Sequence, residues 1–138
     1  MQDLSLTEYQ ALAEFRHHIR IFLRFSEDQV RALQLEPQQH QLLLAIKGLP
    51  SGTSATVGEL AERMLLKHHS TVELVDRLER HGFVRRRASR EDHRQVIIHL
   101  TPAGGNVLRK LSLAHHHELK TSGPALSKAL QRLLRHAA

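Results

Sequence analysis

The feature that most constrains this chain is an amphipathic segment near its N-terminal end, from Thr7 to Leu33. Apolar residues recur there in early steps of three, four and three, which places them on one face of a helix. They are Leu12, Phe15, Ile19, Phe22, Val30 and Leu33. Such a helix would span about 40 Å at 1.5 Å per residue. Because 138 residues suffice for a single domain, a helix this long is expected to pack against more than its own core.

Composition excludes several classes of function. The chain has no cysteine, which rules out disulfides, thiolate zinc sites and cysteine nucleophiles. Aromatic residues make up only 4% and tryptophan is absent, so base-stacking platforms for single-stranded nucleic acid are disfavoured. The longest apolar run is Leu42–Ile46, far too short to span a bilayer, and no basic-then-apolar signal pattern opens the chain. These observations predict a folded cytoplasmic protein.

A second helix is marked at both of its ends. Proline fits a first helical turn, so Glu36-Pro37 ends the long helix and begins another. Gly48 then ends this helix, and a loop rich in glycine, serine and threonine follows. Because Leu42–Ile46 lies between the two signals, this helix is expected to be central and buried.

Two shorter helices follow, separated by a tight turn near Leu66–His68. Thr56 and Glu59 form a capping box, in which the threonine hydroxyl accepts from an early backbone N–H and the glutamate reaches back. The apolar stripe of the first helix is Leu60, Ala61 and Met64. The second helix ends at Gly82, and its apolar face is Val72, Leu74, Val75 and Leu78. This pattern predicts a helix-turn-helix.

Two predicted strands, the first basic and the second rich in β-branched residues, are followed by two further predicted helices. Phe83–Ala88 and Val96–Leu100 are predicted strands around a polar turn. Thr101-Pro102 opens the next helix with an N-cap and a first-turn proline. Ser122-Gly123-Pro124 is expected to begin a last helix whose inward residues are Leu126, Leu130, Leu133 and Leu134. The predicted fold is mainly α with a small antiparallel β-wing.

Positive charge gathers on the predicted hairpin. The net charge is +6, and six arginines against two acids lie between Arg80 and Arg94. A helix-turn-helix followed by a basic hairpin is a winged helix, whose second helix fits a major groove about 12 Å wide. Arginine on the wing suits the negative potential of a minor groove. The pattern therefore indicates double-stranded DNA as the partner.

Several short motifs stand in a fixed order and spacing across most of the chain. They are Leu35-Glu36-Pro37, Leu42-Leu43, Leu60-Ala61-Glu62-Arg63, Ser70-Thr71-Val72, Leu74-Val75-Asp76-Arg77-Leu78-Glu79, Gly82-Phe83-Val84, Asp92-His93-Arg94 and Leu100-Thr101-Pro102-Ala103-Gly104. This arrangement resembles the MarR family of winged-helix transcription regulators. The Asp-x-Arg wing followed by Leu-Thr-x-x-Gly is its most specific part. One departure is Gly104-Gly105-Asn106, where the family usually has a charged helix former after the first glycine.

The resemblance implies a domain organisation and a function. Residues 1–35 and 101–138 would be dimerisation helices, and residues 55–100 the winged helix-turn-helix lobe that binds DNA. The expected protein is a homodimeric repressor of a roughly palindromic site, and dimerisation would cover the Phe15, Ile19 and Phe22 face of the long helix. A small-molecule effector would lodge between the two regions and favour a spacing of recognition helices that misfits DNA.

The resemblance also assigns DNA-binding residues. The start of the recognition helix supplies Lys67, His68, His69, Ser70 and Thr71. Arg77 would contact phosphate or base further along, Arg94 would enter the minor groove from the wing tip, and Asp92 would orient it. Arg86 and Arg90 of the basic hairpin complete the predicted set.

Each assignment has a simpler alternative. The strand arginines could be a solvated face, and alternation puts Arg86 opposite Arg85 and Arg87. Asp92 and Arg94 could be only a turn-stabilising pair, although surface pairs contribute about 0–1 kcal/mol. Arg77 could be the exposed side of an amphipathic helix.

The histidines suggest zinc binding as an alternative, and a protein-contact module and an enzyme must also be considered. His40 with His115-His116-His117 could hold zinc, but three consecutive histidines point in three directions around a helix, so we expect no metal site. A zinc-responsive regulator of the same fold and a winged-helix module for protein contacts stay open as alternatives. No glycine-rich phosphate loop, Gly-x-Ser-x-Gly or His-Glu-x-x-His motif is present, so neither an enzyme nor a cofactor is expected.

Overall fold

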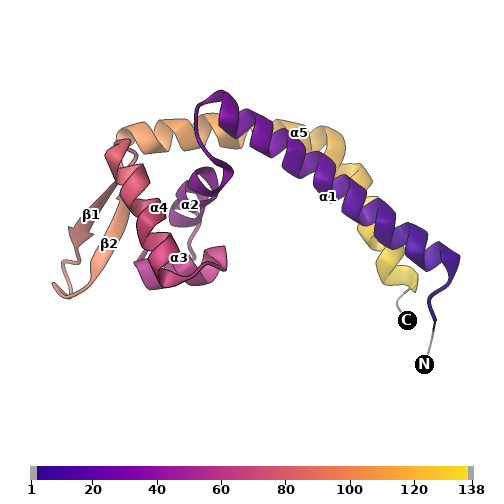
Figure 1. The fold of residues 1–138 in the computed structure, drawn as a ribbon, viewed down its shortest axis with the longest axis horizontal. Coiled ribbons are helices and arrows are strands. Elements are labelled where there is room, and N and C mark those ends of the chain that lie inside the picture. The colour runs from indigo at the N-terminus through magenta and orange to yellow at the C-terminus, as the bar shows by residue number, and fades with distance from the viewer. Residues whose placement is uncertain (1–2, 137–138) are drawn as a thin grey trace.

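The computed structural model describes residues 3–136 and divides into a lobe and an arm (Figure 1). The elements in chain order are α1 (Leu6–Ala32), α2 (Pro37–Lys47), α3 (Val57–Met64), α4 (His68–Arg80), β1 (Val84–Ala88), β2 (Val96–Leu100) and α5 (Pro102–His136). The lobe contains α2, α3, α4 and the hairpin, and the arm pairs α1 with the second half of α5. The predicted mainly α fold with a β-wing is confirmed.

The long first helix begins earlier than the sequence pattern suggested. Ser5 accepts a hydrogen bond from the Glu8 backbone N–H through its hydroxyl, and the Glu8 carboxylate accepts from the Ser5 N–H, each at 3.2 Å. This reciprocal capping satisfies two backbone donors at the start of α1. Gln34, at φ 62°, lies just past the last turn, and Pro37 then begins α2 as predicted.

The core of the lobe lies where α2, α3, α4 and the hairpin meet. Its fully buried side chains include Leu42, Leu43, Leu60, Leu78 and Ile98. The Thr56 hydroxyl caps α3 by accepting from the Glu59 N–H at 3.2 Å, as predicted. The Glu59 carboxylate does not reach back, because it pairs with Arg63 one turn further along at 3.3 Å.

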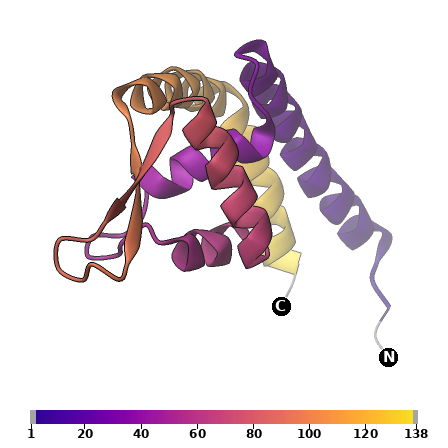
Figure 2. The ribbon, with the colours of Figure 1, turned by 60° about the vertical axis from the view of Figure 1, so that its left-hand side comes forward.

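The hairpin is antiparallel and leaves the lobe beside α4 (Figure 2). Its register pairs Val84 with Leu100 and Arg86 with Ile98. The Ile98 N–H donates to the Ala55 carbonyl at 2.8 Å, which ties β2 to the loop that precedes α3. The base of the hairpin is therefore fixed to the lobe while its turn extends away.

The predicted break at Ser122-Gly123-Pro124 is wrong, because α5 runs without interruption from Pro102 to His136. Proline inside a helix costs about 3 kcal/mol or more, so packing must offset that cost. The second half of α5 lies along α1 over most of the arm (Figure 1), and Ala11 and Ala129 are buried there. No helix among residues 3–136 combines the length and apolar character needed to cross a membrane.

Candidate nucleic-acid interface

The N-terminal end of α4 presents a polar, exposed group of side chains. Lys67 is the N-cap residue, and Lys67, His68 and His69 are all exposed. Ser70 is half-buried beside them. The opposite face of α4 anchors the helix through buried Leu74, Val75 and Leu78. The first turn of α4 is therefore free to meet a partner, and Arg77 is exposed two turns further along.

Thr71 does not belong to this exposed group, although the sequence analysis placed it there. Its side chain is fully buried, and its hydroxyl donates to the Lys67 carbonyl at 3.0 Å. Thr71 stands three, four and seven residues before Leu74, Val75 and Leu78, which is the spacing of one helix face. That spacing was a signal available in the sequence, and it places Thr71 with the core rather than at a surface.

The turn of the wing carries Arg90, Asp92 and Arg94, all exposed. The Asp92 carboxylate accepts from the Arg94 backbone N–H at 3.0 Å, which stabilises the turn. Its contact with the Arg94 Nε is looser, at 3.8 Å, and the Arg94 side chain is 96% exposed. Asp92 thus shapes the backbone around Arg94 and leaves the guanidinium available.

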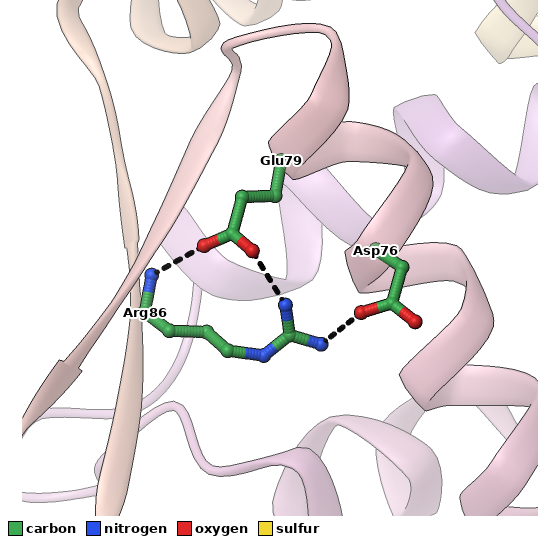
Figure 3. Close-up of polar contacts among 3 residues, drawn as sticks. All are labelled: Asp76, Glu79 and Arg86. Atoms are coloured by element: carbon green, nitrogen blue, oxygen red, sulfur yellow. Dashed lines mark hydrogen bonds and ion pairs between the residues drawn. The ribbon is translucent and has the colours of Figure 1, made fainter.

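Arg86 lies on the inner face of β1 and is bound to α4 (Figure 3). Its guanidinium donates to Glu79 Oε1 at 2.7 Å and to Asp76 Oδ1 at 2.5 Å, and its backbone N–H donates to Glu79 Oε2 at 3.1 Å. Burial alone would lower the pKa of Arg86, but hydrogen bonds and charge attraction from Asp76 and Glu79 outweigh it and raise the pKa. The Arg86 side chain is half-buried and already bound to Asp76 and Glu79, so it is not among the candidate DNA contacts.

Arg85 and Arg87 lie on the other face of β1 and are exposed. Together with His99 they line a small hollow of about 220 Å³ at the base of the wing. Arg86 was the predicted DNA contact within this run of three arginines. Alternation along a strand separates the faces, but it does not say which face meets the lobe. The candidate interface therefore consists of the first turn of α4, Arg77, the wing turn and these two strand arginines.

Comparison with known proteins relates this geometry to a family. Residues 33–95 match the model of the MarR family, a span from the end of α1 to the turn of the wing. Over that span the chain is similar to the MarR family. Over 91 residues it is 37% identical to YfiV of Bacillus subtilis (strain 168), an HTH-type transcriptional regulator. That match covers 66% of this chain and 54% of YfiV, so the chain spans about half the length of this curated relative.

Solved structures of MarR-family proteins share the whole fold. AbsC from Streptomyces coelicolor, a MarR family transcriptional regulator, is 20% identical with a TM-score of 0.73, covering 99% of this chain and 97% of its own. A MepR mutant from S. aureus bound to an oligodeoxyribonucleotide is 16% identical with a TM-score of 0.70, covering 99% and 100%. At such identities these similarities show the winged-helix fold.

A second feature of the chain is a cavity of about 450 Å³ between α1, α2 and α5. Its lining includes Phe22, Ser26, His40, Leu44, His115 and Leu119. His115 donates from Nδ1 to the Leu111 carbonyl, and its Nε2 lies 2.6 Å from the Ser26 hydroxyl. The ring of His40 stacks on that of His115 with centroids 4.9 Å apart. The cavity is thus mainly apolar, with one polar corner.

The three histidines that line the cavity, His40, His115 and His116, are not placed to hold a metal ion. Within residues 3–136, no group of three or more His, Asp or Glu side chains is placed to hold a metal ion. His115 and His116 of the triplet both line the cavity, whereas His117 is exposed and is not part of the lining. The zinc-responsive alternative therefore gains no support from the geometry.

His40 should make the protein less stable in mild acid. Burial, and then the neighbouring His115, lower the pKa of His40 to about 4. An unfolded chain takes up that proton near pH 6.5, so stability is lost as the pH falls from about 6.5 toward 4. Between pH 7.5 and 5, the free energy of unfolding should fall by about 2 kcal/mol more in the unaltered chain than in His40→Phe.

Urea unfolding at one fixed protein concentration and several pH values measures this difference. Phenylalanine keeps a flat ring against His115 but cannot take a proton. The control is His117→Gln on the exposed side of α5, which should retain the acid sensitivity of the unaltered chain. Equal acid slopes for His40→Phe and the unaltered chain would show that His40 does not stay neutral in the fold.

Proposed function

We propose that this chain is a homodimeric, sequence-specific regulator of transcription that binds double-stranded DNA, acts as a repressor and catalyses no reaction. The observation that carries the proposal is the joint exposure of the α4 first turn and the wing turn. Both lie on the side of the lobe away from α5 (Figures 1 and 2). Its place of action would be the cytoplasm.

The proposed contacts follow from the shapes of the two DNA grooves. With α4 in a major groove, Lys67, His68 and His69 would reach base edges or phosphates, as the N-terminal residues of recognition helices do. The wing would then lie along the backbone, with Arg94 in the adjacent minor groove. Arg90 and the outer strand arginines would add sequence-independent attraction to phosphate.

The arm supports the homodimer. Its two helices leave several large apolar side chains exposed in a single chain, namely Leu6, Tyr9, Leu12, Leu119, Leu130 and Leu134. Phe15, Ile19 and Phe22, which the sequence analysis expected a partner to cover, are already half-buried within the chain. A second copy packed on the arm would bury the remaining surface, and a twofold dimer requires a roughly palindromic site.

The cavity beside His115 supports a response to a small-molecule effector. It lies where the arm meets α2, and α2 packs both on the proposed dimerisation helices (residues 1–35 and 101–138) and on the proposed DNA-binding lobe (residues 55–100). An effector that fits only one arrangement of arm and lobe would bias the spacing of the two recognition helices. Its apolar walls favour an apolar ligand with a polar group near the histidines.

Arg94→Ala should weaken DNA binding about tenfold or more while leaving the melting temperature nearly unchanged. The Arg94 side chain is 96% exposed, so its removal costs almost no packing. A DNA sequence selected from a random pool by the unaltered chain serves as the ligand, and its affinity is measured across a salt series. Loss of one phosphate contact per wing should lower the salt slope by about one per wing.

The matched control is Arg24→Ala, which removes the same charge from an exposed position on α1. That variant should bind the selected DNA within about a factor of two of the unaltered chain, because Arg24 lies on the arm and surface ion pairs contribute little. Unchanged affinity in a folded Arg94→Ala protein would mean that the wing does not contact DNA. Failure of the unaltered chain to select any sequence would contradict the proposed function itself.

A further inference from the structure

The joint between the recognition helix and the wing is an ion cluster that the proposed DNA contacts do not use. Asp76 and Glu79 stand three residues apart on α4, one helical turn, and both face β1 (Figure 3). Arg86 bridges them through two nitrogens of its guanidinium, and its backbone N–H adds a third bond to Glu79. Three bonds from one residue fix the orientation of the strand against the helix, since both side-chain bonds are charge-assisted.

The position of Arg86 along the wing gives this cluster its importance. Val84, at the base of β1, is buried, whereas Arg87 and Ala88 beyond Arg86 are exposed. Arg86 is therefore the last residue of β1 that touches the lobe before the strand runs out to the turn. Without it, the outer half of the hairpin would be held by its own ladder, by Ile97 of β2, which lies opposite Arg87 and packs against the core, and by contacts nearer the base.

We propose that Arg86 is a positioning residue that sets the angle of the wing relative to α4. This inference rests on the proposed DNA binding. Bound to Asp76 and Glu79, Arg86 directs the wing turn so that Arg94 reaches a minor groove while α4 occupies the neighbouring major groove. Stability alone is a weak explanation for the cluster, because partly exposed ion pairs contribute little to folding.

A double-mutant cycle between Arg86 and Arg94 tests the proposal. Arg86→Gln removes the clamp, and Arg94→Ala removes the contact that the clamp would position. In the unaltered chain, Arg94→Ala should lower affinity for the selected DNA about tenfold. In the Arg86→Gln background, the same change should lower it less than about threefold, because the wing no longer delivers Arg94. The loss of DNA affinity in the double variant would then be smaller than the product of the losses in the two single variants.

Arg85→Gln is the matched control, because it removes an equal charge from the neighbouring residue on the opposite face. The affinity loss of the Arg85→Gln, Arg94→Ala double variant should equal the product of the two single losses, as expected for independent contacts. A second variant, Asp76→Asn with Glu79→Gln, removes the clamp while making the protein more positive. A role in charge alone predicts that this variant binds DNA more tightly. Positioning predicts that it too reduces the Arg94→Ala loss to less than about threefold.

The outcomes separate the proposal from the function on which it rests. An unaltered chain that selects no DNA overturns both. A second outcome is that the unaltered chain selects DNA and Arg94→Ala still lowers affinity the full tenfold in both clamp-free backgrounds. These backgrounds are Arg86→Gln and the double variant Asp76→Asn, Glu79→Gln. That outcome overturns only the positioning role. Circular dichroism melting identifies a background that does not fold. Because the two backgrounds alter different residues of the cluster, either one that folds decides the result.

Discussion

Replacing Leu130 and Leu134 together with aspartate should yield a folded monomer that binds the selected DNA at least about 100-fold more weakly than the unaltered chain. These side chains are 41% and 66% exposed in the arm of a single chain, one turn apart on α5. In the proposed dimer they would be covered, and a carboxylate buried at an apolar interface without a partner is very costly. A monomer would also lose the gain from engaging two half-sites at once.

Sedimentation at micromolar concentration checks the assembly, and titration of the selected DNA checks binding. The control is Leu65→Asp, which places the same charge at a leucine that is 91% exposed in the turn between α3 and α4. Aspartate tolerates the left-handed backbone of that position, at φ 55°. Leu65→Asp should remain dimeric. A stable dimer of the Leu130→Asp, Leu134→Asp variant would place the dimer interface elsewhere.

Gly104→Ala should destabilise the protein by about 3 kcal/mol or more. A Cβ atom at Gly104 would lie 2.0 Å from the Phe83 carbonyl oxygen and 2.9 Å from its carbonyl carbon. Both are backbone atoms at the junction between α4 and β1, so no flexible side chain can move aside. The Thr101 hydroxyl donates to the Gly82 carbonyl at 2.6 Å in the same junction, which restricts any adjustment.

The neighbouring glycine supplies the control. A Cβ atom at Gly105 would meet nothing within 4 Å, and the residue lies inside α5. Gly105→Ala should therefore raise the free energy of unfolding by about 0.5–1 kcal/mol, because alanine favours the helix. Denaturant midpoints at one protein concentration compare the two variants. Similar midpoints would show that the close approach of Phe83 to Gly104 relaxes without cost.

Local signals in the sequence predicted most of the fold. The Thr56 cap, the Glu36-Pro37 boundary and the β-branched Val96–Leu100 each act through neighbouring residues, and all three lie where they were expected. Pro124 was misjudged because its cost is offset by packing against α1, which lies about 100 residues earlier in the chain. The motif in the sequence singled out Gly104 over Gly105, but only the position of Phe83 in the structure gives the physical reason.

The candidate interface was predictable to a smaller extent. The first turn of α4 and the wing turn follow from the order of elements, and their exposed residues match that expectation. The role of Arg86 did not follow, because its partners Asp76 and Glu79 lie on another element, ten and seven residues away. Contacts between elements depend on how a helix and a strand are oriented, which residue spacing alone does not determine.

The uninterrupted course of α5 has a mechanical consequence. The helix starts at the wing, crosses the lobe and reaches the cavity at His115 before it enters the arm. From Pro102 to His115 it rises about 20 Å, over 13 steps of 1.5 Å. If this segment of α5 acts as a rigid lever of that length, tilting it by about 10° moves the lobe by about 3.5 Å. This is close to the 3.4 Å rise of one base pair. In the proposed dimer, such a tilt at His115 would put the two lobes one base pair out of register with their half-sites.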